Sequence, residues 1–111
     1  MPKHTNDRLQ GTLDLLILNI LARGGAQHGY AIAQRIHQAT DDSLRIEEGS
    51  LYPALQRMLI KGWVVAGWKQ TENNRRARYY HLTPAGRKQL GTELSQFERV
   101  TGAIHKVIQT A

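Results

Sequence analysis

The sequence contains no cysteine, and its apolar runs are short. The absence of cysteine excludes a disulfide framework, a thiolate metal site and a thiol nucleophile. The longest apolar run, from Leu13 to Leu21, is interrupted by Asp14 and Asn19, whereas a membrane-spanning helix needs about 20 apolar residues. The first eight residues also lack the apolar segment of a signal peptide. We therefore expect a cytoplasmic protein with no membrane contact.

Groupings of residues that would support catalysis or metal binding are equally scarce. The acidic pairs Asp41-Asp42 and Glu47-Glu48 are adjacent in sequence, so the two members of each pair do not normally converge on one substrate atom. The histidines lack the i, i+4 spacing of a helical metal site. They are His4, His28, His37, His81 and His105. We expect no catalytic residues, no metal and no cofactor, and hence no enzyme.

Basic charge, in contrast, is plentiful and concentrated in one segment. The chain has 111 residues and a formal net charge of +6, a length typical of one domain. Residues 1–44 and 89–111 are each neutral overall, so the entire excess lies in residues 45–88. The cations there are Arg45, Arg57, Lys61, Lys69, Arg75, Arg76, Arg78, Arg87 and Lys88. Such a segment indicates a surface for a polyanion, although a merely solvated region remains the alternative.

Apolar periodicity predicts three helices in the first half of the chain. The first is expected to start at Thr12 as its N-cap and to end at Gly24-Gly25. The second starts near Gly29, and the third extends from about Gly49 to Lys61. At about 100° per residue, the third helix has an apolar stripe, an exposed face opposite it, and Tyr52 on the border. That exposed face contains Ser50, Pro53, Gln56, Arg57 and Lys61.

The second half predicts a hairpin followed by a long helix. Residues 63–68 and 78–82 are rich in aromatic and β-branched types, which favours two strands joined by a polar, basic tip at residues 69–77. Thr83 as N-cap and Pro84 as first helical residue start a helix that continues to about Gln109. At 1.5 Å per residue it is roughly 40 Å long, more than so small a domain can cover.

One face of this last helix carries an apolar seam with alternating spacings of four and three, the coiled-coil period. The seam consists of Leu90, Leu94, Phe97, Thr101, Ile104 and Ile108. Part of it needs a partner, most simply a second copy of the chain. We therefore predict a homodimer with the seam as its interface.

The order of three helices and a basic hairpin is that of a winged helix-turn-helix, in which the third helix enters the major groove of DNA. The fold class is thus mainly α with a small β-hairpin wing. Residues 1–83 are predicted to form the DNA-binding domain, and residues 84–111 the dimerisation helix, packed with it as one compact unit.

Four sequence blocks also carry a family resemblance. They are GTLDLLILNIL (11–21), HGYAIAQRI (28–36), EEGSLYPALQRMLIKGWV (47–64) and RRARYYHLTPAGR (75–87). Together they resemble the PadR family of bacterial transcriptional regulators, in its short type with one C-terminal dimerisation helix. The resemblance implies a homodimeric repressor of its own or neighbouring genes, often released by a small molecule.

DNA contacts are predicted at the third helix, the hairpin and the start of the second helix. Hydroxyls and free N–H groups near a helix N-terminus suit phosphates, and arginine reads guanine or phosphate. The predicted residues are Tyr30, Gln34, Ser50, Tyr52, Pro53, Arg57, Lys61, Lys69, Arg75 and Arg76. Several have structural alternatives: an N-cap for Ser50, core packing for Tyr30 and Tyr52, and a solvated helix face for Arg57.

The remaining aromatic residues are interpreted as structural. Trp63, Trp68, Tyr79 and Tyr80 are expected to pack in the hairpin rather than to stack on bases. Phe97 lies where members of the family often have an aromatic residue in the dimer helix, and in some members that position lines a pocket for a small molecule. Here Phe97 is a candidate effector residue, with a coiled-coil core position as the alternative.

Two other classes of function compete with a duplex-DNA regulator. Winged helices can also bind structured RNA, and competition between duplex DNA and RNA distinguishes the two. An adaptor that dimerises through its last helix is a third possibility, but it leaves the charge of residues 45–88 unexplained.

Overall fold

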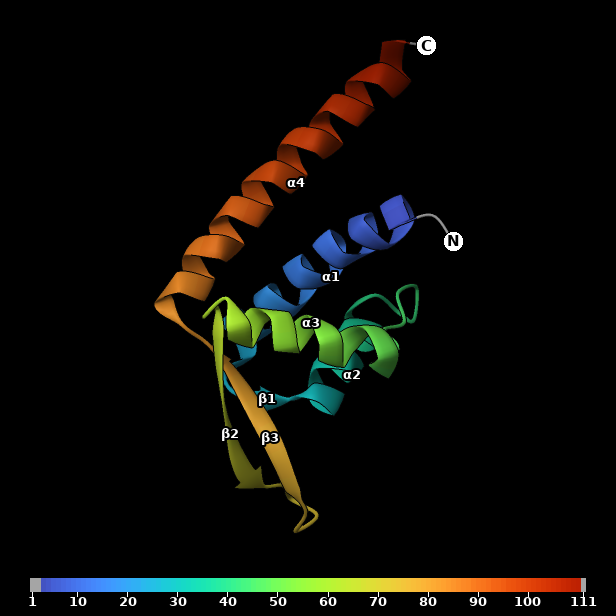
Figure 1. Ribbon diagram of the computed structural model, residues 1–111. Helices are drawn as coiled ribbons and strands as arrows, with labels where there is room; N and C mark the ends of the chain where they lie inside the picture. The colour runs from blue at the N-terminus through green and yellow to red at the C-terminus, as the bar shows by residue number, and fades with distance from the viewer. Residues whose placement is uncertain (1–2, 111) are drawn as a thin grey trace.

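A computed structural model describes residues 3–110, with side chains from Gly11 onward (Figure 1). The elements follow in the order α1 (Lys3–Gly24), β1 (Gln27–His28), α2 (Gly29–Ala39), α3 (Glu48–Ile60), β2 (Val64–Gln70), β3 (Arg76–Leu82) and α4 (Pro84–Thr110). This order confirms a mainly α winged helix-turn-helix with a long C-terminal helix.

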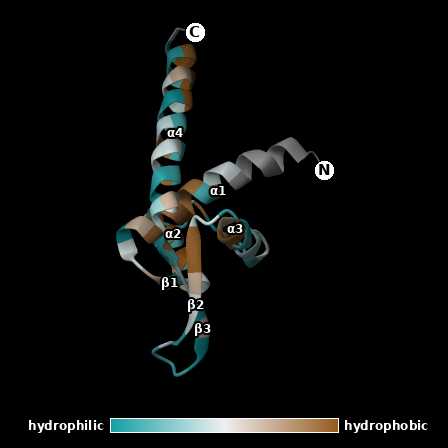
Figure 2. Cartoon of the chain, turned by 60° about the vertical axis from the view of Figure 1, so that its left-hand side comes forward, coloured by the Kyte–Doolittle hydropathy of each residue, from teal (hydrophilic) through white to brown (hydrophobic). Residues whose placement is uncertain are grey.

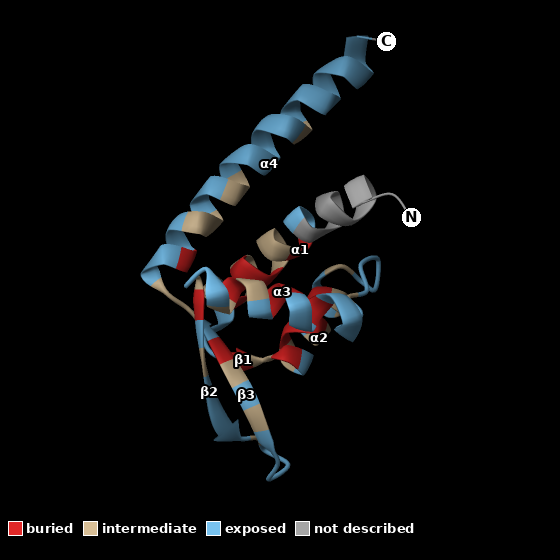
Figure 3. Cartoon of the chain, in the orientation of Figure 1, coloured by how far each residue is buried: buried red, intermediate tan, exposed pale blue. Residues whose placement is uncertain are grey.

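The core lies where α1, α2 and α3 meet the base of the small sheet (Figure 3). Apolar residues spaced three or four apart on each helix place their side chains on one face, and these faces pack together. The fully enclosed side chains include Ile17, Leu18, Leu21, Ile32, Ile36, Leu51, Leu55 and Met58. This core fixes α3 against α1 and leaves the opposite side of α3 to solvent.

The sheet has three antiparallel strands in the order β1-β3-β2. The short strand β1 was not predicted, because two residues are too few to show a strand period; it pairs with Tyr79 and Tyr80 of β3. Val64 and Tyr80 are buried at the base of the hairpin, whereas the outer half is exposed and hydrophilic (Figure 2). The hairpin β2–β3 therefore extends from the core as a wing.

Two predicted boundaries were wrong. Helix α1 begins at Lys3, so Thr12 lies inside the helix and is not its N-cap; a capping residue type permits a helix start but does not force one. The strands continue to Gln70 and Arg76 and pair directly there, so the turn spans only residues 71–75 instead of the predicted 69–77. Asn74 takes a positive φ of 63° in this turn, as asparagine tolerates.

Helix α4 confirms the predicted capping by Thr83 and extends away from the body. The Thr83 hydroxyl oxygen accepts a hydrogen bond from the Gly86 backbone N–H at 3.0 Å. Only the first part of α4 contacts the body, and its distal half is exposed (Figure 3). The molecule measures 56 × 29 × 29 Å, and the wing and the end of α4 lie at opposite ends (Figure 1).

Candidate nucleic-acid interface

Helix α3 presents an exposed face in its first half. Ser50, Tyr52 and Pro53 are exposed there, whereas Leu51 and Ala54 beside them are buried. The N-cap residue is Glu47, whose side chain makes no capping hydrogen bond, so Ser50 is not the N-cap. Pro53 lacks an N–H group, which leaves the carbonyl of Gly49 without its usual helical donor. The exposed face therefore offers both a hydroxyl and a backbone acceptor.

Tyr52 is held in place by the start of α2. A Cβ atom at Gly29 would lie 2.7–2.9 Å from the ring and hydroxyl of Tyr52, so only glycine lets the ring approach this closely. The Tyr52 side chain remains 42% exposed. Its partial burial, and to a smaller extent the negative charge of Glu48, raise the pKa of its hydroxyl. At neutral pH this hydroxyl is a protonated donor at the junction of α2 and α3.

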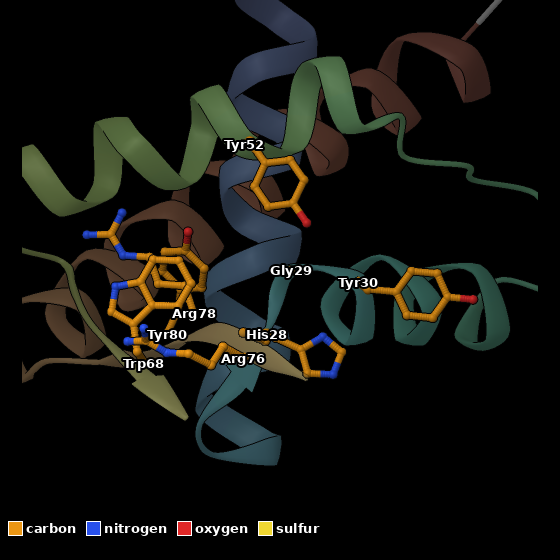
Figure 4. A pocket seen from close by; sticks show the side chains of 9 residues that line it. His28, Gly29, Tyr30, Tyr52, Trp68, Arg76, Arg78 and Tyr80 are labelled. Atoms are coloured by element: carbon orange, nitrogen blue, oxygen red, sulfur yellow. The ribbon is translucent and has the colours of Figure 1, made fainter. Parts of the chain in front are cut away.

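Tyr30 and Gln34 form a second polar pair on α2. The amide of Gln34 donates to the Tyr30 hydroxyl at 2.8 Å, and Tyr30 is 64% exposed. Core packing, the structural alternative for Tyr30, is therefore wrong. Tyr30 lines the same depression as Tyr52 of α3, and Figure 4 shows it on the helix beneath α3.

The wing carries exposed cations that form no ion pair with any other described residue. Arg75 lies in the turn, while Lys69, Arg76 and Arg78 project from the strands. The Trp68 side chain is 61% exposed and lies outside the core, where it packs within the hairpin against Arg76, whereas Tyr80 is buried as expected. The exposure of this large aromatic side chain beside cations could not be predicted from its residue type alone.

Arg57 departs from its predicted place on the exposed face. Its guanidinium lies 2.9 Å from the Asp14 carboxylate of α1, and both side chains are largely covered, with exposures of 31% and 14%. Burial raises the pKa of Asp14 despite the opposing effect of Arg57. The helical-wheel prediction failed because α1 covers part of the side of α3 as well as its apolar stripe. Lys61, just after α3, remains exposed and lies over Trp63.

The predicted seam of α4 lies on one side of the helix and is only partly covered. Leu90, Leu94 and Thr101 are half-buried, while Phe97, Ile104 and Ile108 are 52–63% exposed. Phe97 of the seam and its neighbour Val100 line a groove of about 350 Å³ that α4 forms with Thr12 and Leu15 of α1. The distal part of the seam, at Phe97, Ile104 and Ile108, is thus an apolar surface that the chain itself leaves exposed.

Comparisons with known proteins agree with this architecture. The sequence profile of the transcriptional regulator PadR-like family matches residues 17–92. A transcriptional regulator from Clostridium thermocellum is 31% identical, with a TM-score of 0.81 over 90% of this chain and 96% of that protein. A PadR family regulator from Clostridium difficile is 28% identical, with a TM-score of 0.72 over 86% and 97% of the two chains.

A PadR-like regulator from Bacillus cereus is 25% identical, with a TM-score of 0.77 over 93% and 97% of the two chains. Within the described residues, no helix has the length and apolar character to cross a membrane. The matched profile covers most of the chain, including most of the core, α3 and the wing. The chain therefore belongs to the PadR-like family of transcriptional regulators.

Proposed function

We propose that this protein is a homodimeric repressor that binds duplex DNA upstream of its own or a neighbouring gene. The observation that carries the proposal is the shared surface of α3 and the wing, where exposed donors and unpaired cations lie together. Residues 1–83 form the DNA-binding unit and residues 84–111 the dimerisation helix. Because its target is chromosomal DNA, its site of action is the cytoplasm.

Each proposed contact has a physical role. Ser50, Tyr52 and Pro53 bring α3 to the major groove. Tyr30 and Gln34 of α2 contact the adjoining DNA strand. Lys69, Arg75 and Arg76 bring positive charge to the backbone beside the wing, and Lys61 adds charge at the end of α3. Arg57 reaches DNA only by leaving Asp14, so we assign it the structural role of joining α3 to α1.

The first experiment is a mobility shift with the DNA upstream of the gene, at fixed moderate salt and with excess unrelated duplex. A discrete complex that survives the competitor supports a specific regulator, and lower transcription from that promoter in vitro supports repression. Displacement by structured RNA but not by duplex DNA would favour an RNA-binding protein instead. Loss of all binding would leave only the adaptor function.

Removing the charge of the wing tests which surface binds. Arg75→Ala with Arg76→Ala should weaken binding to all sequences, and the slope of log K against log salt should fall by about 0.9 for each lost phosphate contact. The matched control is Arg99→Ala with Lys106→Ala on α4, which removes the same charge from exposed positions far along the chain. Equal effects of the two double variants would show that net charge, and not the wing, determines affinity.

A small-molecule effector has a natural place in the groove beside Phe97. An aromatic compound bound there would contact α1 and α4 together, and α1 is tied to α3 through Asp14 and Arg57. Release of DNA by such a compound from the parent protein, but not from Phe97→Ala, is the test.

A further inference from the structure

The face of the wing that looks toward α3 carries a ladder of alternating aromatic and arginine side chains. Trp68 pairs with Arg78 across the strands, and alternation along β3 places Arg76, Arg78 and Tyr80 on the same face. The Arg76 guanidinium lies 5.2 Å from the centre of the Trp68 ring, and the Arg78 guanidinium lies 5.9 Å from that of Tyr80. Each arginine of this face therefore lies within cation–π distance of an aromatic ring, and the close view in Figure 4 shows these side chains together.

This ladder forms one wall of a depression between the wing and the two helices. His28, Gly29 and Tyr30 at the start of α2 and Tyr52 of α3 line the remainder, and the space is about 430 Å³. In Figure 4, Tyr52 projects from α3 toward Gly29, with the arginines and Trp68 across the gap. The depression thus has a cationic wall and a tyrosine hydroxyl facing one another.

Contact with the aromatic rings prepares these arginines for an anion. A guanidinium lying over a ring keeps the N–H groups at its edge available as hydrogen-bond donors. The long arginine side chain has also already lost part of its conformational entropy. Neither Arg76 nor Arg78 forms an ion pair with another residue of the described chain, so no carboxylate occupies those N–H groups. The Trp68 ring is 61% exposed, so the Arg76 guanidinium that lies over it is held at the surface and not in the core.

The geometry of duplex DNA identifies the anion. When α3 lies in the major groove and the wing lies at the neighbouring minor groove, the sugar–phosphate strand between the two grooves must pass between these elements. The depression is the space between α3 and the wing, and its wall is positive. A continuous phosphate strand also suits an open trough better than an isolated small anion does.

We propose that this depression holds the sugar–phosphate strand that separates the two grooves. Arg76 and Arg78 bind successive phosphates, and the Tyr52 hydroxyl donates to the strand from the opposite wall. Trp68 is a positioning residue that acts through Arg76. The inference rests on the proposed function, because it requires that duplex DNA is the ligand.

The experiment separates the charge of Arg76 from its stacking. Dissociation constants of the full-length protein are measured for the upstream duplex and for an unrelated duplex over a range of salt concentrations. Arg76→Lys keeps the charge but loses the planar stack, so we expect several-fold weaker binding with an unchanged salt slope. Arg76→Ala should weaken binding further and also lower the slope by about 0.9, the value for one phosphate.

Substitutions of Trp68 test the positioning role. Trp68→Ala should weaken binding of both duplexes several-fold without changing the salt slope, and Trp68→Phe should restore most of the affinity. The matched control is Val65→Ala, which truncates an apolar residue that is 43% exposed on the other face of the same strand and should bind as the parent protein does. Thermal unfolding of each variant verifies that the wing is still folded.

Three outcomes would overturn the assignment. Parent-like binding by Trp68→Ala and Arg76→Lys would show that stacking is irrelevant. A loss confined to the upstream duplex would mean that Trp68 reads bases. Displacement of DNA by a millimolar mononucleotide, with the same dependence on Arg76, would reassign the depression to a small ligand. If the parent protein binds no duplex at all, the proposed function fails first, independently of the ladder.

Discussion

At the scale of single residues, the contact between Arg57 and Asp14 shows how a predicted DNA-binding cation becomes a structural one. Arg57→Ala should lower the free energy of unfolding by about 1–3 kcal/mol, since it leaves a mostly buried carboxylate without its partner. Asp14→Asn removes the charge together with the need for a partner, and its effect should be smaller. Urea unfolding of both variants at neutral pH gives the comparison.

The pH dependence of this loss has a defined sign. Because burial raises the pKa of Asp14 above its ordinary value of 3.8, its contribution to stability is fully present in acid and is lost as the pH rises through the raised value. The positive charge of Arg57 opposes this rise of the Asp14 pKa. Removing Arg57 therefore raises the pKa further, and stability continues to be lost up to a higher pH. The stability difference between the parent and Arg57→Ala should therefore be largest near neutrality and shrink in acid. A difference that is constant with pH would contradict this account.

At the scale of elements, the joint between the wing and α4 depends on one glycine. A Cβ atom at Gly86 would collide with the backbone carbonyl of Trp63, which also accepts a hydrogen bond from the Thr83 backbone N–H at 3.0 Å. Neither the Trp63 carbonyl nor the Thr83 backbone N–H can move without breaking the N-terminal capping of α4. Gly86→Ala should therefore destabilise the fold by about 1–3 kcal/mol, as over-packing does.

Gly91 provides the matched control in the same helix. No atom lies within 4 Å of a Cβ built there, so alanine should stabilise α4 by about 0.5–1 kcal/mol through its helix propensity. Thermal unfolding at one protein concentration measures both variants. Equal effects at the two positions would mean that the close contact at Gly86 relaxes easily.

The elements that the sequence predicts well are those defined by apolar periodicity and by capping or turn residues. The apolar stripe of α3, the N-cap of α4 and the strand composition of the hairpin each lie within a short stretch of chain. The pairing of Arg57 with Asp14, the exposure of Trp68 and the two-residue strand β1 depend on segments far apart in sequence. Local patterns carry no information about such partners, so Arg57 was predicted on the exposed face although its guanidinium lies against Asp14.

At the scale of the whole molecule, the shape is extended by a helix that reaches beyond the body. The radius of gyration is 15.4 Å, against about 13 Å expected for a compact chain of this length. The excess reflects α4, which carries its apolar seam beyond the body. A partner pairing along this seam would bury Ile104 and Ile108, which are 52% and 63% exposed in one copy.

Breaking that seam is the decisive test of the dimer. Ile104→Asp should give a monomer, because a carboxylate would be buried against apolar side chains in the interface. The substitution spares the fold of one copy, since Ile104 is half exposed and lies outside the core. Ser95→Asp adds the same charge to an exposed position off the seam and should remain a dimer. Sedimentation at matched concentrations distinguishes the two.

DNA binding then connects the dimer to function. A two-fold dimer presents two α3 helices to half-sites about 34 Å apart or a multiple of that distance, so both copies contribute to operator affinity. The Ile104→Asp monomer should lose most of its preference for the upstream duplex but retain weak, salt-sensitive binding to any duplex, because each wing still carries its cations. A variant that sediments as a dimer, or a monomer that keeps full operator affinity, would remove the seam from the mechanism.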